Sequence, residues 1–433
     1  MITTIIISIV TCIVLILSVL FFPKIKIRHL NINTYWVVAL IGALSLIILN
    51  LVNGTDIVNT LFSNSPMNPI KILILFFSMT LLSIFLDEVG FFKYLASIAG
   101  SIAKSNQIVL FVILYFLIAI LTVFTSNDIV ILTFTPFICY FCKNSDIDPI
   151  PYLVGEFAAA NTWSMMLIIG NPTNIFLASS YNIDFLTYLK VMFIPTLVAG
   201  IVEFILILLV FRKKLNKPMV NHFEVSHITN RFDFVVSIIH LGICLILLVI
   251  SSYIHLDMWL ISLLCAISLL LIILISKLIT RTKLNSLFST IKRLPYELIP
   301  FVLSMFIIVI GLNKYNISNY ISNLLGDKDI IFRYGVLSFL CCDLINNIPM
   351  SVLFSSIPHM SLEVNNLRAI YATIIGSNIG AFLTPIGALA GIMFTSLLVK
   401  YDVNYGFKKF IKYGIIISIP TLLVALITLT IIL

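Results

Sequence analysis

Residues 152–180 read YLVGEFAAANTWSMMLIIGNPTNIFLASS, an apolar run that is long enough to cross a bilayer but is interrupted by Gly170–Asn174 (GNPTN). At the interruption, proline removes a backbone hydrogen-bond donor and glycine loosens the helix. A second run, 368–398, is interrupted in the same way by Thr384–Gly387 (TPIG). The pattern therefore predicts two broken helices inside a membrane.

The rest of the chain has the composition of a membrane protein. Of its 433 residues 61% are hydrophobic and 10% are charged, whereas about a quarter of a soluble domain is charged. These proportions exclude a water-soluble globule, and unbroken apolar runs such as 5–22 and 414–433 exclude an outer-membrane barrel. The net charge of +8 comes without a nucleic-acid-binding pattern. We expect an all-α polytopic protein of the cell membrane with about ten transmembrane helices.

Two further apolar runs, 107–142 and 330–358, are too long for one crossing and carry polar centres at Thr125–Asp128 and Asp343–Pro349. Each run is predicted to form a re-entrant hairpin, although two full crossings would give the same loop parity. When the basic loop 24–28 is placed in the cytoplasm, most of the 26 Lys and Arg residues fall on that side. This bias agrees with the positive-inside rule.

The chain also repeats itself, because window 69–100 aligns with window 295–326 without a gap. In each half a span, an amphipathic stretch, a hairpin, a broken helix and a span follow in the same order. The spans that open the two halves run in opposite directions, and inverted repeats with broken helices are typical of transporters. The predicted organisation is N-terminal scaffold spans at 1–68, a first inverted repeat at 69–211, a linker with two spans at 212–294 and a second inverted repeat at 295–433. Interfacial amphipathic stretches are expected at 91–103, 317–325 and 405–413.

Polar side chains at the hairpin tips and helix breaks are costly in lipid unless protein, water or a ligand satisfies them. Their oxygens suit cations such as Na⁺, and half-helix N-termini suit anionic or strongly polar solutes. The alternative is that they only shape kinks and satisfy freed backbone groups. The predicted substrate- and ion-binding residues are Ser126, Asn127, Asp128, Asn171, Thr173, Asn174, Asn346, Asn347, Thr384, Pro385 and Gly387.

Asp128, Asp343 and Glu203 are candidates for proton coupling. The alternatives are a solvated interfacial carboxylate for the two aspartates and a structural hydrogen bond for Glu203. Cys139 and Cys142 have C-x-x-C spacing but lack a third ligand. This favours a role as small, packed apolar side chains over a metal site. Because no Walker A loop, G-x-S-x-G or H-E-x-x-H motif occurs, we predict neither ATP-driven pumping nor catalysis. No cofactor is predicted, only a coupling ion, H⁺ or Na⁺.

Three motifs resemble those of a known family, the arsenite and antimonite efflux pumps (arsenical pump membrane proteins). Ser126–Pro136 (SNDIVILTFTP) resembles the family's N-D…L-T-P element. Leu344–Pro349 (LINNIP) and Leu383–Ala390 (LTPIGALA) are similar to its N-N-[LI]-P and T-P-I-G-[SA]-L-A elements. The family belongs to the ion transporter superfamily, together with divalent-anion/Na⁺ symporters and Na⁺/H⁺ antiporters. Two departures exist: Gly170–Asn174 resembles the break of the anion symporters, and Ile345–Asn347 lacks their Ser-Asn-Thr.

The resemblance implies a secondary active transporter that exports arsenite or antimonite in exchange for protons by an elevator movement. It further implies that the solute is a small inorganic or organic anion or a metalloid. The protein would lie in the lipid bilayer as a homodimer, with or without a separate ATPase partner, and would have no nucleic acid partner. The alternatives are Na⁺-coupled symport of di- or tricarboxylates or other oxyanions, and Na⁺/H⁺ antiport. A membrane scaffold subunit without solute flux is the alternative from another class of protein.

Overall fold

The computed structural model describes residues 2–22, 24–27, 30–62, 68–103, 106–219, 228, 230–251, 253–326, 328–357 and 362–433. Nearly all of its secondary structure is helical, which confirms the expected all-α polytopic fold. The exception is a two-stranded antiparallel hairpin, β1 (Lys24–Ile27) and β2 (Leu30–Asn33). In this described part, seven segments are long and apolar enough to cross a membrane: Pro69–Glu88, Gln107–Phe124, Phe185–Leu215, Arg231–Val249, Met258–Ile279, Asn285–Lys314 and Phe407–Ile432.

Two series of helices follow the same order along the chain: a long helix, a short one, a helix pair, an interrupted helix and a final long helix. The first series comprises α4 (Pro69–Glu88), α5 (Phe91–Ala103), α6 (Gln107–Phe124), α7 (Asn127–Asn144), α8 (Ile150–Trp163), α9 (Pro172–Ser180) and α10 (Phe185–Leu215). The second comprises α14 (Leu298–Lys314), α15 (Ile317–Leu325), α16 (Ile330–Ile345), α17 (Asn347–Phe354), α18 (Glu363–Gly380), α19 (Leu389–Lys400) and α20 (Phe407–Ile432).

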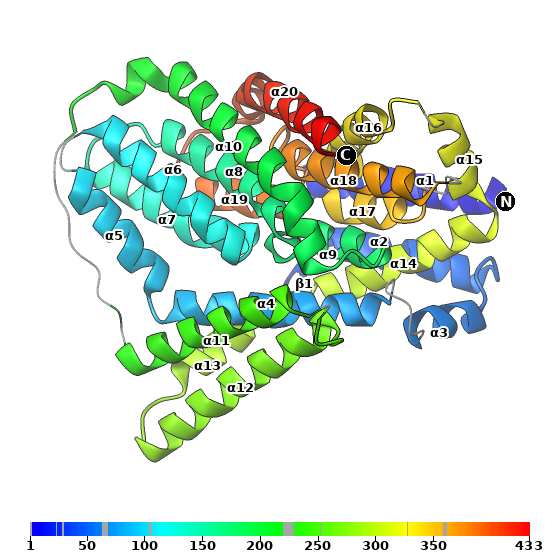
Figure 1. Cartoon of the computed structure of the whole chain (residues 1–433), viewed down its shortest axis with the longest axis horizontal. Helices are drawn as coiled ribbons and strands as arrows, with labels where there is room; N and C mark the ends of the chain where they lie inside the picture. The colour runs from blue at the N-terminus through cyan, green and yellow to red at the C-terminus, as the bar shows by residue number, and fades with distance from the viewer. Residues whose placement is uncertain are drawn as a thin grey trace.

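The other helices flank these series. They are α1 (Ile2–Phe21), α2 (Thr34–Ile48), α3 (Gly54–Phe62), α11 (Arg231–Val249), α12 (Met258–Ile279) and α13 (Asn285–Arg293). Figure 1 shows α5, α6 and α7 toward one end of the long axis, and α3 and α15 toward the opposite end. Helices α4, α11, α12 and α13 form a layer beneath α6, α7, α8 and α10 in that view.

Several helices begin at a polar residue that caps the free backbone donors of the first turn. Asn68 accepts hydrogen bonds from the backbone at the start of α4, and Asn106 does the same for α6. Asp184 caps α10, and Asn230 caps α11. An Asn or Asp side chain at such a position replaces the missing intrahelical partner, so these residues fix where the apolar helices start.

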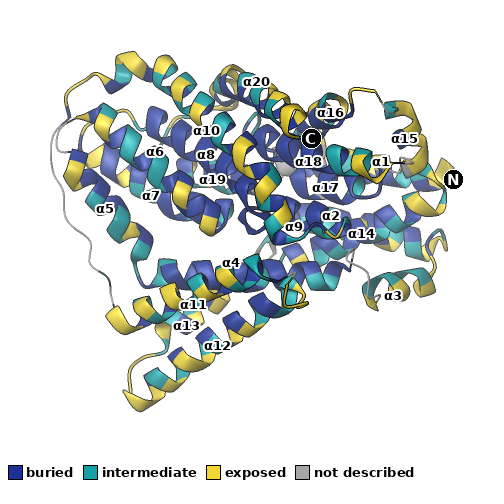
Figure 2. Cartoon of the chain, viewed as in Figure 1, coloured by how far each residue is buried: buried dark blue, intermediate teal, exposed yellow. Residues whose placement is uncertain are grey.

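The broken helices lie at the centre of the molecule, as Figure 2 shows for α8 and α18. Every residue of α8 is buried, and so is α18 from Ala369 to Gly380. Helices α16 and α18 approach closely because small residues line their contact. A Cβ atom at Gly376 would lie 2.0 Å from Ser338 Oγ and 2.2 Å from the Gly335 carbonyl oxygen, so only glycine fits there.

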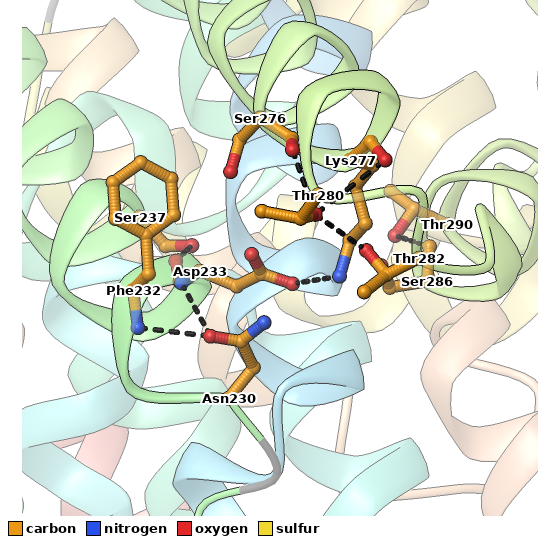
Figure 3. Close-up of polar contacts among 10 residues, drawn as sticks. All are labelled: Asn230, Phe232, Asp233, Ser237, Ser276, Lys277, Thr280, Thr282, Ser286 and Thr290. Atoms are coloured by element: carbon orange, nitrogen blue, oxygen red, sulfur yellow. Dashed lines mark hydrogen bonds and ion pairs between the residues drawn. The ribbon is translucent and has the colours of Figure 1, made fainter.

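An ion pair joins α11 to α12. Asp233 and Lys277 are both buried, and the Lys277 Nζ lies 2.6 Å from the Asp233 carboxylate (Figure 3). The Asn230 side chain that caps α11 also accepts a hydrogen bond from the Asp233 backbone N–H. The pair therefore joins two helices whose exposed side chains are mostly apolar.

The structure adds a strand pair at one expected loop and corrects two other local expectations. The basic loop 24–28 contains β1, because its alternating Lys and Ile residues pair with β2; Arg28 lies outside the described residues. The first helix break begins at Ser164 rather than Gly170, and two short 3₁₀ turns precede α9. The expected interfacial stretch 405–413 is not a separate element, because α20 starts at Phe407 and continues without interruption.

Candidate functional site

The first helix break has a defined backbone geometry. Helix α8 ends at Trp163, and α9 begins at Pro172, which needs no backbone donor at that position. Asn171 caps α9 by accepting a hydrogen bond from the Thr173 N–H at 3.1 Å. Only glycine fits at position 170, because a Cβ atom there would lie 2.2 Å from the Ser164 carbonyl oxygen. The break is therefore specified by its own residues.

Asn378 of α18 joins the two halves at this break. Its Oδ1 accepts hydrogen bonds from Ser164 Oγ at 2.8 Å and from Asn171 Nδ2 at 2.9 Å. Its Nδ2 donates to Asn174 Oδ1 at 2.7 Å. All four side chains are buried. Predicted site residues of the first repeat are thus held by a residue of the second repeat.

A second contact lies beside Asn378. The hydroxyls of Thr173 and Ser377 are 3.3 Å apart, and both residues are buried. The structure therefore brings Asn171, Thr173 and Asn174 together around α18. These interactions satisfy polar groups that would otherwise be unpaired at the centre of the protein.

The first hairpin tip, between α6 and α7, leaves acceptors without partners. Ser126 precedes α7, and Asn127 begins it. The Asn127 Nδ2 donates to Asn161 Oδ1 at 3.3 Å, but Asn127 Oδ1 and Ser126 Oγ are buried without a hydrogen-bond partner among the described residues. Buried acceptors in this state are costly, which indicates a place for water or a bound solute.

The second tip, between α16 and α17, bonds to backbone carbonyls of the second helix break. Asn346 has a left-handed φ of 72°, and its Nδ2 donates to the Ile386 carbonyl at 2.9 Å. The Asn347 N–H donates to the Gly387 carbonyl at 2.9 Å. The structure thus places Asn346, Asn347 and Gly387 together.

The break itself contains Thr384 and Pro385, both half-buried, in the connection between α18 and α19. The Thr384 hydroxyl donates to Asp343 Oδ1 at 2.7 Å. Asp343 Oδ2 is buried and has no partner in the described part of the chain. Asp343 therefore interacts with the second break from the end of α16, next to the second tip.

A cavity of about 650 Å³ opens beside the first tip. Asp128 and Leu132 line it from α7, Ser126 lines it just before that helix, and α19 contributes its last turns. The other lining residues are Asn33 and residues of α2 and α4, together with the segment from Arg293 at the end of α13 to Leu298 at the start of α14. Asp128 is the only one of the three proton-coupling candidates among the lining residues.

Glu297 is the second carboxylate among the lining residues. The Asn33 side chain donates to Glu297 Oε2 at 2.5 Å, and the Tyr35 hydroxyl donates to the same oxygen at 3.1 Å. Asn33, Tyr35 and Glu297 all line the cavity together with Asp128. Two carboxylates therefore border one cavity.

Two cations also line the cavity. Arg293 is paired, because its guanidinium lies 2.6 Å from Asp87 and 2.5 Å from Glu88 at the end of α4. Lys400, at the end of α19, is exposed, and its Nζ lies 5.8 Å from the centre of the Tyr401 ring. Basic side chains thus line the cavity in addition to the two carboxylates.

Glu203, the third candidate for proton coupling, lies elsewhere. It is fully buried in α10, where Tyr115 donates to its Oε1 at 2.9 Å and the Thr162 hydroxyl donates to Oε2. Such a satisfied carboxyl group fits the structural alternative that the sequence left open. Glu156 is also buried and accepts a hydrogen bond from Thr135 at 2.9 Å.

A second cavity, of about 600 Å³, lies at the opposite end of α4. Lys71 and Asp257 form a 3.2 Å ion pair at its edge, and the Trp259 indole donates to Asp257 at 2.8 Å. The hydrogen bond from Trp259, followed by that from Lys71, lowers the pKa of the Asp257 carboxyl despite partial burial. No predicted site residue lines this cavity.

Sequence reasoning missed five residues of the candidate site: Asn161, Ser164, Asn378, Tyr35 and Glu297. Asn161 follows Ala158–Ala160, and Asn378 lies between Gly376 and Gly380. An asparagine among small residues of an apolar run was therefore a sequence signal for these two site residues. Tyr35 and Glu297 lie far from the motifs in sequence, and only the fold brings them to the cavity.

Metal binding has no support from the arrangement of side chains. In the described ranges, no group of three or more His, Cys, Asp or Glu residues is placed to hold a metal ion. Cys139 and Cys142 are buried free thiols on α7. The chemistry available at the candidate site is hydrogen bonding by amides and hydroxyls, together with carboxylates that can bind cations.

Comparison with known proteins gives consistent matches. The family model described as "Citrate transporter" matches residues 13–367. The arsenical pump membrane protein of Escherichia coli is 24% identical over 367 residues, which cover 81% of this chain and 84% of that protein. A putative arsenical pump membrane protein of Bacillus subtilis is 25% identical over 373 residues, covering 80% and 84%.

A solved structure shares the fold. The crystal structure of the YdaH transporter of Alcanivorax borkumensis aligns with a TM-score of 0.59 over 99% of this chain and 98% of that chain. The sequence identity of 13% is low, so the match concerns the fold alone.

Proposed function

This chain belongs to the citrate transporter family and is a multi-pass transporter of the plasma membrane, and from this premise we propose that it exports arsenite or antimonite in exchange for protons. The relatives named above that are described as arsenical pumps support this choice of solute. The motifs at Ser126–Pro136 and Leu383–Ala390 support it as well.

The position of Asp128 is the observation that carries the proposal. A carboxylate that couples proton and solute movement must be reachable from water and must lie beside the solute. Asp128 lines the 650 Å³ cavity, and the unpartnered Ser126 hydroxyl lies in the same tip. In the proposed cycle, Asp128 takes up a proton when the site faces the outside and releases it into the cytoplasm.

The chemistry of arsenite fits the unpartnered acceptors. Arsenite at neutral pH is an uncharged trihydroxide, so it presents O–H donors rather than negative charge. Ser126 Oγ and Asn127 Oδ1 are buried oxygens that can accept hydrogen bonds from such donors. The deprotonated Asp128 carboxylate can accept another, so proton release would favour solute binding.

We propose an elevator movement for the two sides of the cavity. One wall consists of α7 and α19, which come from the first helix pair and from the second broken helix. The other wall comes from α2, α4 and the α13–α14 connection. A cavity between two such walls changes its opening when one wall slides along the other.

Na⁺-coupled symport of citrate or another carboxylate is the second candidate. The description of the matching family model favours it. Arg293 and Lys400 line the cavity and could attract an anion, although the two acidic partners of Arg293 weaken its contribution.

Purified protein in liposomes would separate these functions. Flux of arsenite and of labelled citrate would be measured under an imposed pH gradient and under an imposed Na⁺ gradient. The proposal predicts arsenite flux driven by the pH gradient and independent of Na⁺. Citrate uptake that requires Na⁺, with no arsenite flux, would replace it with the second candidate.

A further inference from the structure

The junction between α12 and α13 has an unusual concentration of uncompensated positive charge. Between Met258 and Tyr296 the sequence contains no acidic residue. Of the five basic residues in this segment, Lys277 pairs with Asp233, and Arg293 pairs with acidic residues of α4. The remaining basic residues are exposed and have no acidic partner in the described part of the chain: Arg281, Lys283 and Lys292.

Hydroxyl groups gather at the same junction. The hydroxyls of Thr280 and Thr282 lie 3.0 Å apart at the end of α12. Ser286 Oγ, in the first turn of α13, is buried and has no partner among the described residues. Figure 3 shows these three side chains beside Lys277 and Thr290. Hydroxyl donors close to exposed basic side chains suit the oxygens of a phosphate group.

The neighbouring surface is strongly apolar. Leu278 is 62% exposed, Ile279 is 76% exposed and Phe288 is 68% exposed. Leu287, in contrast, is buried and attaches α13 to the protein. An apolar surface beside basic side chains is what a helix at the membrane interface presents to lipid.

We propose that Arg281, Lys283 and Lys292 form, with the Thr282 and Ser286 hydroxyls, a binding site for the phosphate headgroup of an anionic phospholipid of the cytoplasmic leaflet. The exposed side chains Leu278, Ile279 and Phe288 contact its acyl chains. The positive charge of the site matches the negative charge of that leaflet. We call these residues the α12–α13 lipid site.

Helix α13 connects the proposed lipid site to the lining of the transport cavity. Arg293 is the last residue of α13, and it both lines the cavity and pairs with Asp87 and Glu88. The next residues, Leu294 to Leu298, continue along the same wall and include Glu297. A lipid that restrains α13 therefore restrains the wall on which Glu297 is held, so anionic lipid should stabilise the protein.

A lipid titration of the full-length protein in detergent would test the site. Short-chain phosphatidylglycerol is added, and the midpoint temperature of thermal unfolding is followed. The test variant carries Arg281→Gln, Lys283→Gln and Lys292→Gln. The control variant carries Lys408→Gln, Lys409→Gln and Lys412→Gln, which removes the same charge from exposed positions at the start of α20.

The wild type and the control should gain stability with the lipid at similar concentrations. The test variant should need a concentration about 100-fold higher, because each basic side chain near an anionic headgroup contributes about five-fold to affinity. A test variant that titrates like the wild type would overturn the proposal. An equal loss in the control would do so too, because it would indicate a general effect of surface charge.

Two further arms make the test specific. Short-chain phosphatidylcholine should give little stabilisation, and inorganic phosphate alone should give none; equal stabilisation by phosphate would show a free-anion site instead. If the triple variant does not fold, Thr282→Val with Ser286→Ala removes hydroxyls without changing charge. This variant should bind phosphatidylglycerol more weakly, and unchanged binding would refute the headgroup site. None of these readouts depends on which solute is transported.

Discussion

Replacing Asn378 with alanine should destabilise the junction of the two halves more than any other single amide deletion at the candidate site. Asn378 accepts hydrogen bonds from Ser164 and Asn171 and donates to Asn174. All four residues are buried in the centre of the protein, where water cannot easily replace a lost partner. The substitution Asn378→Ala therefore removes the contact by which α18 of the second repeat holds the first helix break.

The magnitude follows from the groups that lose their partners. The Ser164 hydroxyl can donate its single hydrogen to the Asn161 carbonyl instead, at 2.6 Å. Asn171 Nδ2 and Asn174 Oδ1 lose the bonds that Asn378 supplied. Leaving a buried polar group unsatisfied costs about 1–3 kcal/mol, so two such groups cost about 2–6 kcal/mol.

Thermal unfolding of the detergent-solubilised protein, followed by intrinsic fluorescence, provides the assay. Asn365→Ala is the matched control, because it makes the same change near the start of α18, away from the breaks. We expect Asn378→Ala to unfold at least several degrees below both the wild type and Asn365→Ala, and to lose solute flux. Equal midpoints for the two variants would refute the assignment of Asn378 as the residue that joins the halves.

Three further predictions follow from individual contacts. Lys277→Met should cost about 3–5 kcal/mol by leaving Asp233 buried and unpaired, whereas the double change Asp233→Leu with Lys277→Met should restore most of the stability; thermal midpoints that fall further in the double variant would contradict this account of the pair. Gly376→Ala should cost about 1–3 kcal/mol, because its Cβ atom would collide with Ser338 and the Gly335 carbonyl; a wild-type midpoint would show that α16 and α18 are not in this contact. Asp128→Asn should abolish the dependence of solute flux on the pH gradient in liposomes, while Glu203→Gln should retain it; persistent coupling in Asp128→Asn would remove Asp128 from the mechanism.

The sequence predicted most of the fold because membrane spans depend on local properties. Long apolar runs bounded by polar residues specify helices, and Gly170 and Pro172 mark a break through their own backbone chemistry. The start of that break at Ser164 was not predictable in this way. No glycine or proline lies at Ser164, and the residue is held there by Asn174 and by Asn378 of the second repeat.

Only the site residues that lie in the sequence motifs or helix breaks were predicted. Asn171, Asn174, Asn346 and Asn347 attract attention because asparagine is rare in apolar runs. Glu297 lies at the start of a span and, in sequence, resembles an ordinary interfacial residue. Only the packing of α2 against α14 brings Asn33 and Tyr35 to its carboxylate, and such a pairing across more than half of the chain has no local signal.

The proposed transport cycle requires that the first hairpin tip borders water on the cytoplasmic side. Leu132 lines the cavity, whereas Ile120 on α6 is exposed on the apolar surface of the same helix pair. The single-cysteine variants Leu132→Cys and Ile120→Cys are made in a protein whose seven native cysteines are replaced. Each variant is then treated with a charged, membrane-impermeant thiol reagent, once in inside-out and once in right-side-out vesicles. We predict that Leu132→Cys reacts in inside-out vesicles and that Ile120→Cys reacts in neither. Protection of Leu132→Cys in both orientations, or its reaction only from the outside, would contradict the claim.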